Sequence, residues 1–309
     1  MTLSIIILVL GLIVLIIGGE FLIKGSVGIA NYFSISPLVI GMTVVSFGTS
    51  APELIVSLKA ALGGSPEIAI GNVIGSNIAN LGLVLGITAL IFPLMIDRQS
   101  IKVDWPMLMF ASALFYLFTI DGIIERWEGA TLFFALIAFT VWLIKDSKKK
   151  LKGHQDIETK KGNIYYALIF TLIGLTGLYF GSEWLLIGAV DIAETAGMSK
   201  HLIGVTIIAF GTSVPELTTS CIAAFRKQTD ISIGNLIGSN IFNIMAVIGL
   251  TGIVQPIRVD RTVLDFDVFW VVGIALALFP IMRFGFNVSR PKGAFLLLIY
   301  IAYVLILLS

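Results

Sequence analysis

Long apolar runs alternate with short polar stretches along the whole chain. Several runs contain about 18 or more residues with few charges, which is the length that a helix needs to cross a bilayer. The alternation therefore predicts an all-α integral membrane protein with ten transmembrane helices and mostly short connections. The predicted spans are residues 3–23, 39–62, 67–93, 105–120, 127–144, 164–187, 202–224, 230–255, 264–282 and 293–308.

The composition agrees with this fold class. Of the 309 residues, 57% are hydrophobic and 13% are charged, whereas a soluble domain is typically about 45–50% apolar and about 25% charged. The formal net charge is +1, and no basic domain indicates a nucleic-acid partner. The single cysteine, Cys221, excludes an internal disulfide. The two histidines, His154 and His201, fall in predicted loops, so no Cys/His metal cluster is expected.

The second half of the chain repeats the first. Adding 163 to a first-half position gives its counterpart, so that Glu53 corresponds to Glu216 and Pro93 to Pro256. Because each half contains an odd number of predicted spans, the second half must enter the membrane from the opposite side, which makes the halves inverted repeats. We expect a first repeat at residues 1–146, a linker at 147–162 and a second repeat at 163–309.

Lysine and arginine are distributed unevenly between the two sides of the membrane. Fifteen of the 20 lie in loops that follow odd-numbered spans, and seven of these fall between residues 145 and 161. Cytoplasmic loops carry the excess of Lys and Arg. The linker is therefore predicted to be cytoplasmic and both termini extracellular, in a multi-pass protein of the cell membrane.

One motif, Gly-Thr-Ser-X-Pro-Glu, lies inside an apolar run of each half, at residues 48–53 and 211–216. An ionisable residue at membrane depth is costly and is by default part of a functional site. Proline lacks an N–H and leaves a carbonyl of the preceding turn unpaired, and such carbonyls are tolerated where they line a polar cavity. The carbonyls expected to turn inward are those around Ser46, Gly48 and Thr49 and around Ala209, Gly211 and Thr212.

A second motif lies in the third span, where Asn72, Ser76 and Asn80 recur every four residues and share a helical face. With the glutamate motif it predicts a central chamber lined by carboxylates, hydroxyls, amides and carbonyls. All of these are oxygen donors, which suit hard cations such as Ca²⁺ with its roughly six to eight oxygen ligands. The eighth span repeats the face as Asn235, Ser239 and Asn243.

Charge balance narrows the function. Two carboxylates balance one divalent cation, and monovalent cations or protons must compensate them when that ion leaves, which is how an antiporter works. The same fold with H⁺ or K⁺ coupling, or with another divalent substrate, is an alternative, as are a passive channel and an intramembrane enzyme. An enzyme needs a nucleophile–base pair or a metal centre, and both histidines lie outside the spans, so the chain is predicted not to be an enzyme.

At these motifs the sequence resembles the sodium/calcium exchanger family of the cation/Ca²⁺ exchanger superfamily, over essentially its whole length. It is most similar to the compact prokaryotic and archaeal members. The resemblance implies Na⁺-driven Ca²⁺ transport by alternating access, with the first and sixth spans as a moving pair. It implies that the chain interacts with Ca²⁺, Na⁺ and the lipid bilayer, and it implies no cofactor and no protein partner. The implied ion ligands are Glu53, Glu216, Thr49, Thr212, Ser50, Ser213, Ser76, Ser239, Asn80, Asn243, Ser46 and Ala209.

One position departs from the family pattern. Many members have Asp where Asn243 stands, whereas here Asn80 and Asn243 are both amides. The departure weakens the case for K⁺ dependence and leaves the number of Na⁺ per Ca²⁺ open. The proton/calcium exchanger branch usually carries Glu where this chain has Gly75 and Gly238, so that branch is less similar.

Overall fold

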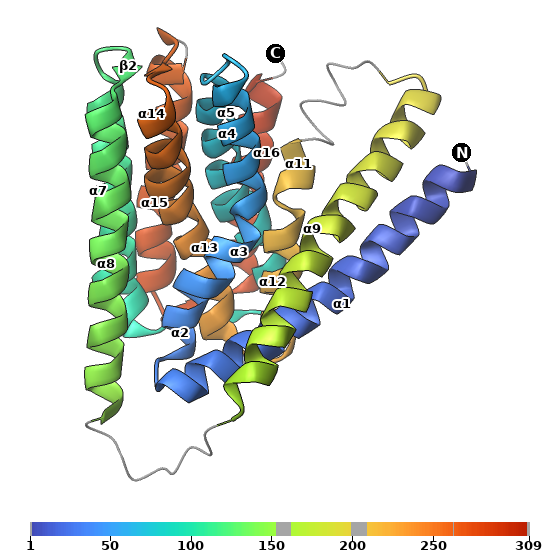
Figure 1. Ribbon diagram of the computed structural model, residues 1–309, viewed down its shortest axis with the longest axis vertical. Coiled ribbons are helices and arrows are strands. Elements are labelled where there is room, and N and C mark those ends of the chain that lie inside the picture. Colours follow the sequence, from blue (N-terminus) through green and yellow to red (C-terminus); the bar gives the residue numbers. More distant parts are fainter. Residues whose placement is uncertain (1, 153–161, 199–208, 262, 308–309) are drawn as a thin grey trace.

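The computed structural model describes residues 2–152, 162–198, 209–261 and 263–307. Within these ranges the chain is almost entirely helical, and most helices stand side by side in one bundle (Figure 1). The strands among the described residues are only two residues long. The predicted all-helical membrane fold is confirmed.

The described elements follow the same order in both halves, except that the positions corresponding to α2 and η1, residues 200–208, lie outside the described residues; η denotes a π-helical segment. The first half comprises α1 (Thr2–Phe33), α2 (Pro37–Ile40), η1 (Gly41–Val45), α3 (Ser46–Thr49), α4 (Ala51–Leu62), α5 (Ile68–Ile78), η2 (Ala79–Val84), α6 (Leu85–Ile91), β1 (Leu94–Met95), η3 (Ser100–Asp104), α7 (Trp105–Thr119), β2 (Ile123–Ile124) and α8 (Arg126–Lys152). The second comprises α9 (Ile164–Thr195), α11 (Ala209–Thr212), α12 (Val214–Phe225), α13 (Thr229–Phe242), η5 (Asn243–Ile248), α14 (Gly249–Val254), β3 (Ile257–Arg258), η6 (Val263–Asp267), α15 (Val268–Arg283), β4 (Asn287–Val288) and α16 (Arg290–Leu307).

Among the described residues, eight helices are long and apolar enough to cross a membrane. A ninth span is formed by Pro37–Thr49 and Ala51–Leu62, which are bent by 44° at their junction. The predicted seventh span, residues 202–224, begins outside the described residues, and α11 and α12 account for its second part. The number ten therefore stays a prediction.

Helices α1 and α9 occupy equivalent positions in the two halves and run antiparallel to each other, as inverted repeats require. Near one end Gly11 of α1 meets Leu185 of α9, and near the other Gly25 meets Thr171. In Figure 1 the two helices lie side by side and are tilted away from the remaining bundle. We call them the α1–α9 pair.

Glycines allow the α1–α9 pair to pack backbone against backbone. A Cβ built on Gly174 would lie 2.4 Å from the backbone nitrogen of Leu22, and one on Gly11 would lie 2.5 Å from that of Leu185. No side chain fits at such distances, so these positions need glycine. Small residues that let helices approach closely are typical of membrane helix interfaces, and here they join the halves.

Two short ladders also pair the halves. Strand β1 is antiparallel to β4, with Leu94 opposite Val288, and β2 is antiparallel to β3, with Ile124 opposite Ile257. Because β1 corresponds to β3 in the repeat and β2 to β4, the two ladders are equivalent to each other. Each ladder therefore joins a connecting segment of one half to a connecting segment of the other.

The centre of the bundle is formed by two helices that each contain a π-helical segment. The spans Ile68–Ile91 and Thr229–Val254 are mostly buried, whereas the other candidate spans expose most of their residues. Many exposed side chains on these outer helices are large and apolar, which suits contact with lipid. The buried pair α5–η2–α6 and α13–η5–α14 carries the second motif of each half and forms the wall of the candidate site.

Candidate ion-binding site

The glutamate motifs break their helices in the same way. The backbone of Ser50 has φ −90° and ψ 6°, and that of Ser213 has φ −90° and ψ 1°, so α3 ends before α4 and α11 before α12. Proline follows two residues later, where it can start a helix because its missing N–H needs no partner there. Glu53 and Glu216 consequently lie in the first turn of α4 and α12, where the helix dipole favours negative charge.

Both glutamates are completely buried. The Oε1 atom of Glu53 accepts from the Ser76 hydroxyl at 3.5 Å, and Oε1 of Glu216 accepts from the Ser50 hydroxyl at 3.1 Å. The second bond crosses between halves. Because Ser50 belongs to the motif that carries Glu53, this bond places the Glu216 carboxylate against the first motif, and the two predicted acids lie in one buried region.

Thr49 joins the first motif to α13 of the other half. Its hydroxyl lies 3.1 Å from Oδ1 of Asn235 and 3.3 Å from the Ser239 hydroxyl. Asn235 is held in turn, because its Nδ2 donates to Ser220 at 3.1 Å. The first-half counterpart of that brace is Asn72, whose Nδ2 donates to the Ser57 hydroxyl at 3.0 Å and also lies 3.1 Å from the Glu53 carbonyl oxygen.

The amides lie where the buried helices widen. Asn80 is the second residue of η2, and Asn243 is the first residue of η5. Single π-helical turns inside α-helices are frequent at functional sites because they loosen the i→i−4 ladder. Both side chains are fully buried, and Asn243 follows Ser239 by one turn on the same face of its helix.

Several buried polar atoms in this region have no hydrogen-bond partner among the described residues. Native proteins satisfy the large majority of such groups, so a concentration of them points to a ligand. Four of the atoms are oxygens that a cation can use directly. These oxygens are Glu53 Oε2, Glu216 Oε2, Asn80 Oδ1 and Asn243 Oδ1. The Ser213 hydroxyl likewise has no hydrogen-bond partner among the described residues. The donors fit a hard cation.

The backbone positions agree less closely with the prediction. The Ser46 carbonyl accepts from the Ser50 backbone N–H at 3.0 Å and from the Thr49 hydroxyl at 3.4 Å, so it is already engaged within its own helix. Thr212 ends α11 and Ala209 begins it. Residues 199–208, which precede Ala209, lie outside the described ranges.

Two further buried asparagines lie outside the predicted helical face. Asn77 donates from Nδ2 to the Asn240 carbonyl at 3.3 Å, and its Oδ1 accepts from Nδ2 of Asn243 at 3.1 Å. Both Asn77 and Asn240 are 1% exposed. The spacing of Asn72 and Asn80 does not reveal them, but an amide repeated in both halves inside an apolar helix is a signal that could have found them.

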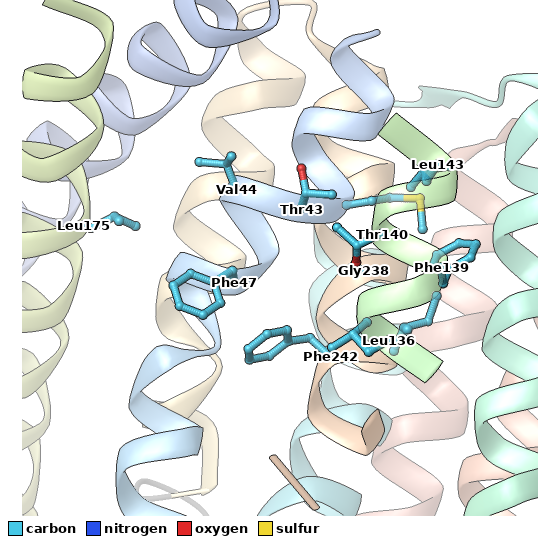
Figure 2. Close-up of a pocket in the computed structure, with 12 residues that line it drawn as sticks. Thr43, Val44, Phe47, Leu136, Phe139, Thr140, Leu143, Leu175, Gly238 and Phe242 are labelled. Atoms are coloured by element: carbon cyan, nitrogen blue, oxygen red, sulfur yellow. The ribbon is translucent and has the colours of Figure 1, made fainter. Parts of the chain in front are cut away.

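A separate cavity of about 310 Å³ lies beside α13. Figure 2 shows that its lining comes from η1, α3, α8, α9 and α13, with the rings of Phe47 and Phe242 close together, and these two rings meet edge to face at 5.3 Å. Thr43 and Thr140 are its polar lining side chains, and none of the described residues that line it is charged. It offers nothing to compensate a cation, so it is distinct from the site of the two glutamates.

The fold and the site together define a class. A helical membrane protein made of inverted repeats, with one buried acid from each half and oxygen donors around them, is a secondary ion transporter. Within the described residues, no group of three or more His, Cys, Asp or Glu residues gathers to hold a metal, so the hydroxyls and amides must complete any coordination shell.

Comparison with known proteins specifies the class. The family described as sodium/calcium exchanger protein matches residues 3–145 and 166–309, and the chain belongs to this family. It is 37% identical to the putative antiporter CaxA of Alkalimonas amylolytica over the full length of both proteins, and 31% identical to the sodium/calcium exchanger MaX1 of Methanosarcina acetivorans over 99% of both. A solved structure of the sodium-calcium exchanger NCX_Mj matches with a TM-score of 0.86, at 32% identity and covering 99% of each chain. Members of the family are transporters, so the predictions of family and of a non-enzymatic function are confirmed.

Proposed function

We propose that this chain exchanges Na⁺ for Ca²⁺ across the cell membrane by alternating access, and that both ions bind between Glu53 and Glu216. The observation that carries the proposal is one fully buried glutamate from each half, each with a carboxylate oxygen that has no partner among the described residues. The relatives named as sodium/calcium exchangers support the choice of ions.

Electrostatics explains why the two ions exclude each other. An isolated carboxylate buried in a low-dielectric interior is strongly destabilised, and a paired cation offsets that cost. One Ca²⁺ neutralises Glu53 and Glu216 together. After Ca²⁺ leaves, Na⁺ ions neutralise them instead. The chamber therefore switches its opening from one side of the membrane to the other only when it holds one ion type or the other. This alternation couples the fluxes.

The proposed ligands divide by chemistry. Ca²⁺ is held by the two carboxylates with the carbonyls of Thr49 and Thr212. Sodium shares these carboxylates and uses the hydroxyls of the neighbouring serines and the backbone of Ser46 and Ala209. The amides of Asn80 and Asn243 line the same chamber. The serines are Ser50, Ser76, Ser213 and Ser239.

The α1–α9 pair is the proposed moving part. It packs tightly on itself through glycine contacts, and its contacts with each other element are much less extensive than those between α1 and α9. Its tilt relative to the other helices is visible in Figure 1. In a protein of inverted repeats, movement of such a pair against the remaining helices opens the chamber to one side and closes it to the other.

The proposed orientation follows the distribution of positive charge. The start of α1 and the end of α16 lie at one end of the molecule, and the end of α8 and the start of α9 lie at the other (Figure 1). The second end carries the basic residues around the linker 147–162, so it faces the cytoplasm and the termini face outward. The family match is interrupted between residues 145 and 166, which supports the division into repeats 1–146 and 163–309.

The function is tested by ⁴⁵Ca²⁺ uptake into proteoliposomes with gradients of Na⁺, K⁺ and H⁺ imposed one at a time. Uptake should occur when the vesicles are loaded with Na⁺ and diluted into Na⁺-free buffer. Uptake that ignores the Na⁺ gradient and follows the pH gradient would overturn the proposal. Flux without any counter-ion would instead indicate a channel.

A further inference from the structure

Asn77 and Asn240 are equivalent in the two repeats but make different hydrogen bonds. Nδ2 of Asn77 crosses between halves and donates to the Asn240 carbonyl at 3.3 Å. Nδ2 of Asn240 instead donates to the Leu236 carbonyl at 2.7 Å, within its own helix. Both side chains are 1% exposed, so bulk water does not replace either hydrogen-bond partner.

The contact of Asn77 with a backbone carbonyl fixes the direction of two amides. A carbonyl oxygen only accepts, so the NH₂ group of Asn77 must face Asn240. The Oδ1 of Asn77 then faces Asn243 and accepts from its Nδ2 at 3.1 Å. With its NH₂ group engaged, Asn243 presents Oδ1 on the face of the helix that carries Ser239, and this oxygen has no partner among the described residues.

The other half lacks this arrangement. Asn80 corresponds to Asn243, but neither atom of its amide has a partner among the described residues. The Oδ1 of Asn240 corresponds to the Oδ1 of Asn77, but it also has no hydrogen-bond partner among the described residues. Hydrogen bonds therefore set the direction of one amide of the chamber, whereas none among the described residues sets that of its counterpart.

We propose that Asn77 is a positioning residue that presents the Asn243 carboxamide oxygen to the transported cation. This inference rests on the ion site proposed above. A ligand that is oriented before the ion arrives loses less conformational freedom on binding. Asn243 is thus a preset oxygen ligand, whereas Asn80 turns its oxygen or its NH₂ group toward the chamber according to the charge that it holds. The sequence departure at Asn243 fits this role, because only the amide can donate to Asn77 without carrying a proton from solution.

The chain provides a matched control for the test. Asn77→Ala removes the orienting contact, and Asn240→Ala removes an equally buried amide that bonds only its own helix. The measurement is the Ca²⁺ concentration for half-maximal Na⁺-driven ⁴⁵Ca²⁺ uptake by the reconstituted full chain. Because Asn77→Ala loses one net hydrogen bond, this half-maximal Ca²⁺ concentration should rise by roughly three- to tenfold. Asn240→Ala should change the value by less than about twofold.

Thermal unfolding of both variants in detergent separates positioning from stability. If Asn77→Ala does not fold, Asn77→Leu and Asn240→Leu form a second pair that keeps the side-chain volume. Equal half-maximal concentrations for the two members of a pair would overturn the role of Asn77.

A double-mutant cycle tests whether Asn77 acts through Asn243. Asn243→Ala should raise the half-maximal concentration, and adding Asn77→Ala to that variant should raise it no further. If Asn77→Ala keeps its full effect in the Asn243→Ala background, the positioning role is wrong. If Asn243→Ala transports like the unmodified chain, the assignment of Asn243 to the ion site is wrong, while Na⁺-driven uptake by the unmodified chain still stands.

Discussion

The hydroxyl of Ser50 in the first half donates to the carboxylate of Glu216 in the second half at 3.1 Å. Both residues are fully buried. The acid of one repeat is therefore held by the motif of the other, and neither motif makes a complete site alone. This contact between the halves makes the effects of single substitutions in the chamber depend on each other.

Neutralising either acid should abolish exchange. Glu53→Gln and Glu216→Gln keep the side-chain volume but leave one negative charge for a divalent cation. We expect Na⁺-driven ⁴⁵Ca²⁺ uptake to fall to the level of empty liposomes for each variant. The exposed Glu67 provides a control, and Glu67→Gln should transport normally. Normal uptake by both buried variants would rule out the site.

Removing the Ser50 hydroxyl should weaken ion binding without unfolding the protein. In Ser50→Ala, Glu216 loses a hydrogen bond to a charged group, an interaction worth about 1.5–3 kcal/mol. The Ca²⁺ concentration for half-maximal uptake should rise by roughly one to two orders of magnitude. Ser112→Ala is the control, because Ser112 is equally buried but donates only to Leu108 in its own helix. Equal behaviour of the two variants would contradict the cross-half role of Ser50.

A side chain at the α1–α9 contact should destabilise the pair. The Cβ of Gly174→Ala would lie 2.4 Å from a backbone atom of Leu22, and overpacking of this kind typically costs about 1–3 kcal/mol. We expect a lower unfolding temperature in detergent and a slower exchange rate. Gly273→Ala should leave both nearly unchanged, since no described atom lies within 4 Å of the position that its methyl group would take.

A contact between α1 and α12 should bias the direction in which the chamber opens. The Arg226 guanidinium meets the Glu20 carboxylate at 2.9 Å, and both side chains are partly exposed. Such pairs are worth about 1 kcal/mol or less, so Glu20→Gln and Arg226→Gln should leave the unfolding temperature nearly unchanged.

The exchange rate is the informative measurement for this pair. Each single variant should alter it by a similar factor, of up to about fivefold, and the double variant should alter it no further. Independent effects of the two substitutions would show that the ion pair does not bias the opening. Lys59→Gln, at an exposed position, controls for the loss of a surface charge.

The helix break and the paired acids could be predicted from the sequence because their signals are local. Pro52 disfavours a continuous helix through its position because it lacks an N–H, and the repeat gives its counterpart, Pro215. The burial of both acids followed from the same apolar runs. The four-residue spacing predicted a chamber lined by hydroxyls and amides, and the family resemblance implied which of them bind ions. Hydrogen bonds join Thr49 to Ser239, Ser50 to Glu216 and Ser76 to Glu53.

The ends of helices and the contacts between halves could not be predicted in this way. The first span was predicted to end before Lys24, yet α1 continues to Phe33. Lys24 is tolerated because its ammonium lies 4.5 Å from the centre of the Phe170 ring, a favourable cation–π distance. The role of Asn77 was also hidden, since its partners are 163 and 166 positions away and no periodicity of one helix reveals them.

The orientation can be tested with single cysteines in a Cys221→Ser background. Thr2→Cys and Lys149→Cys lie at exposed positions at the start of α1 and near the end of α8, which are opposite ends of the molecule (Figure 1). Because the excess of Lys and Arg is cytoplasmic, a membrane-impermeant maleimide should label Thr2→Cys in intact cells and Lys149→Cys only after permeabilisation. Permeabilised cells, in which both positions should react, control for local reactivity. Labelling of Lys149→Cys alone in intact cells would invert the proposed orientation and would place the Arg226–Glu20 contact on the outer side of the membrane.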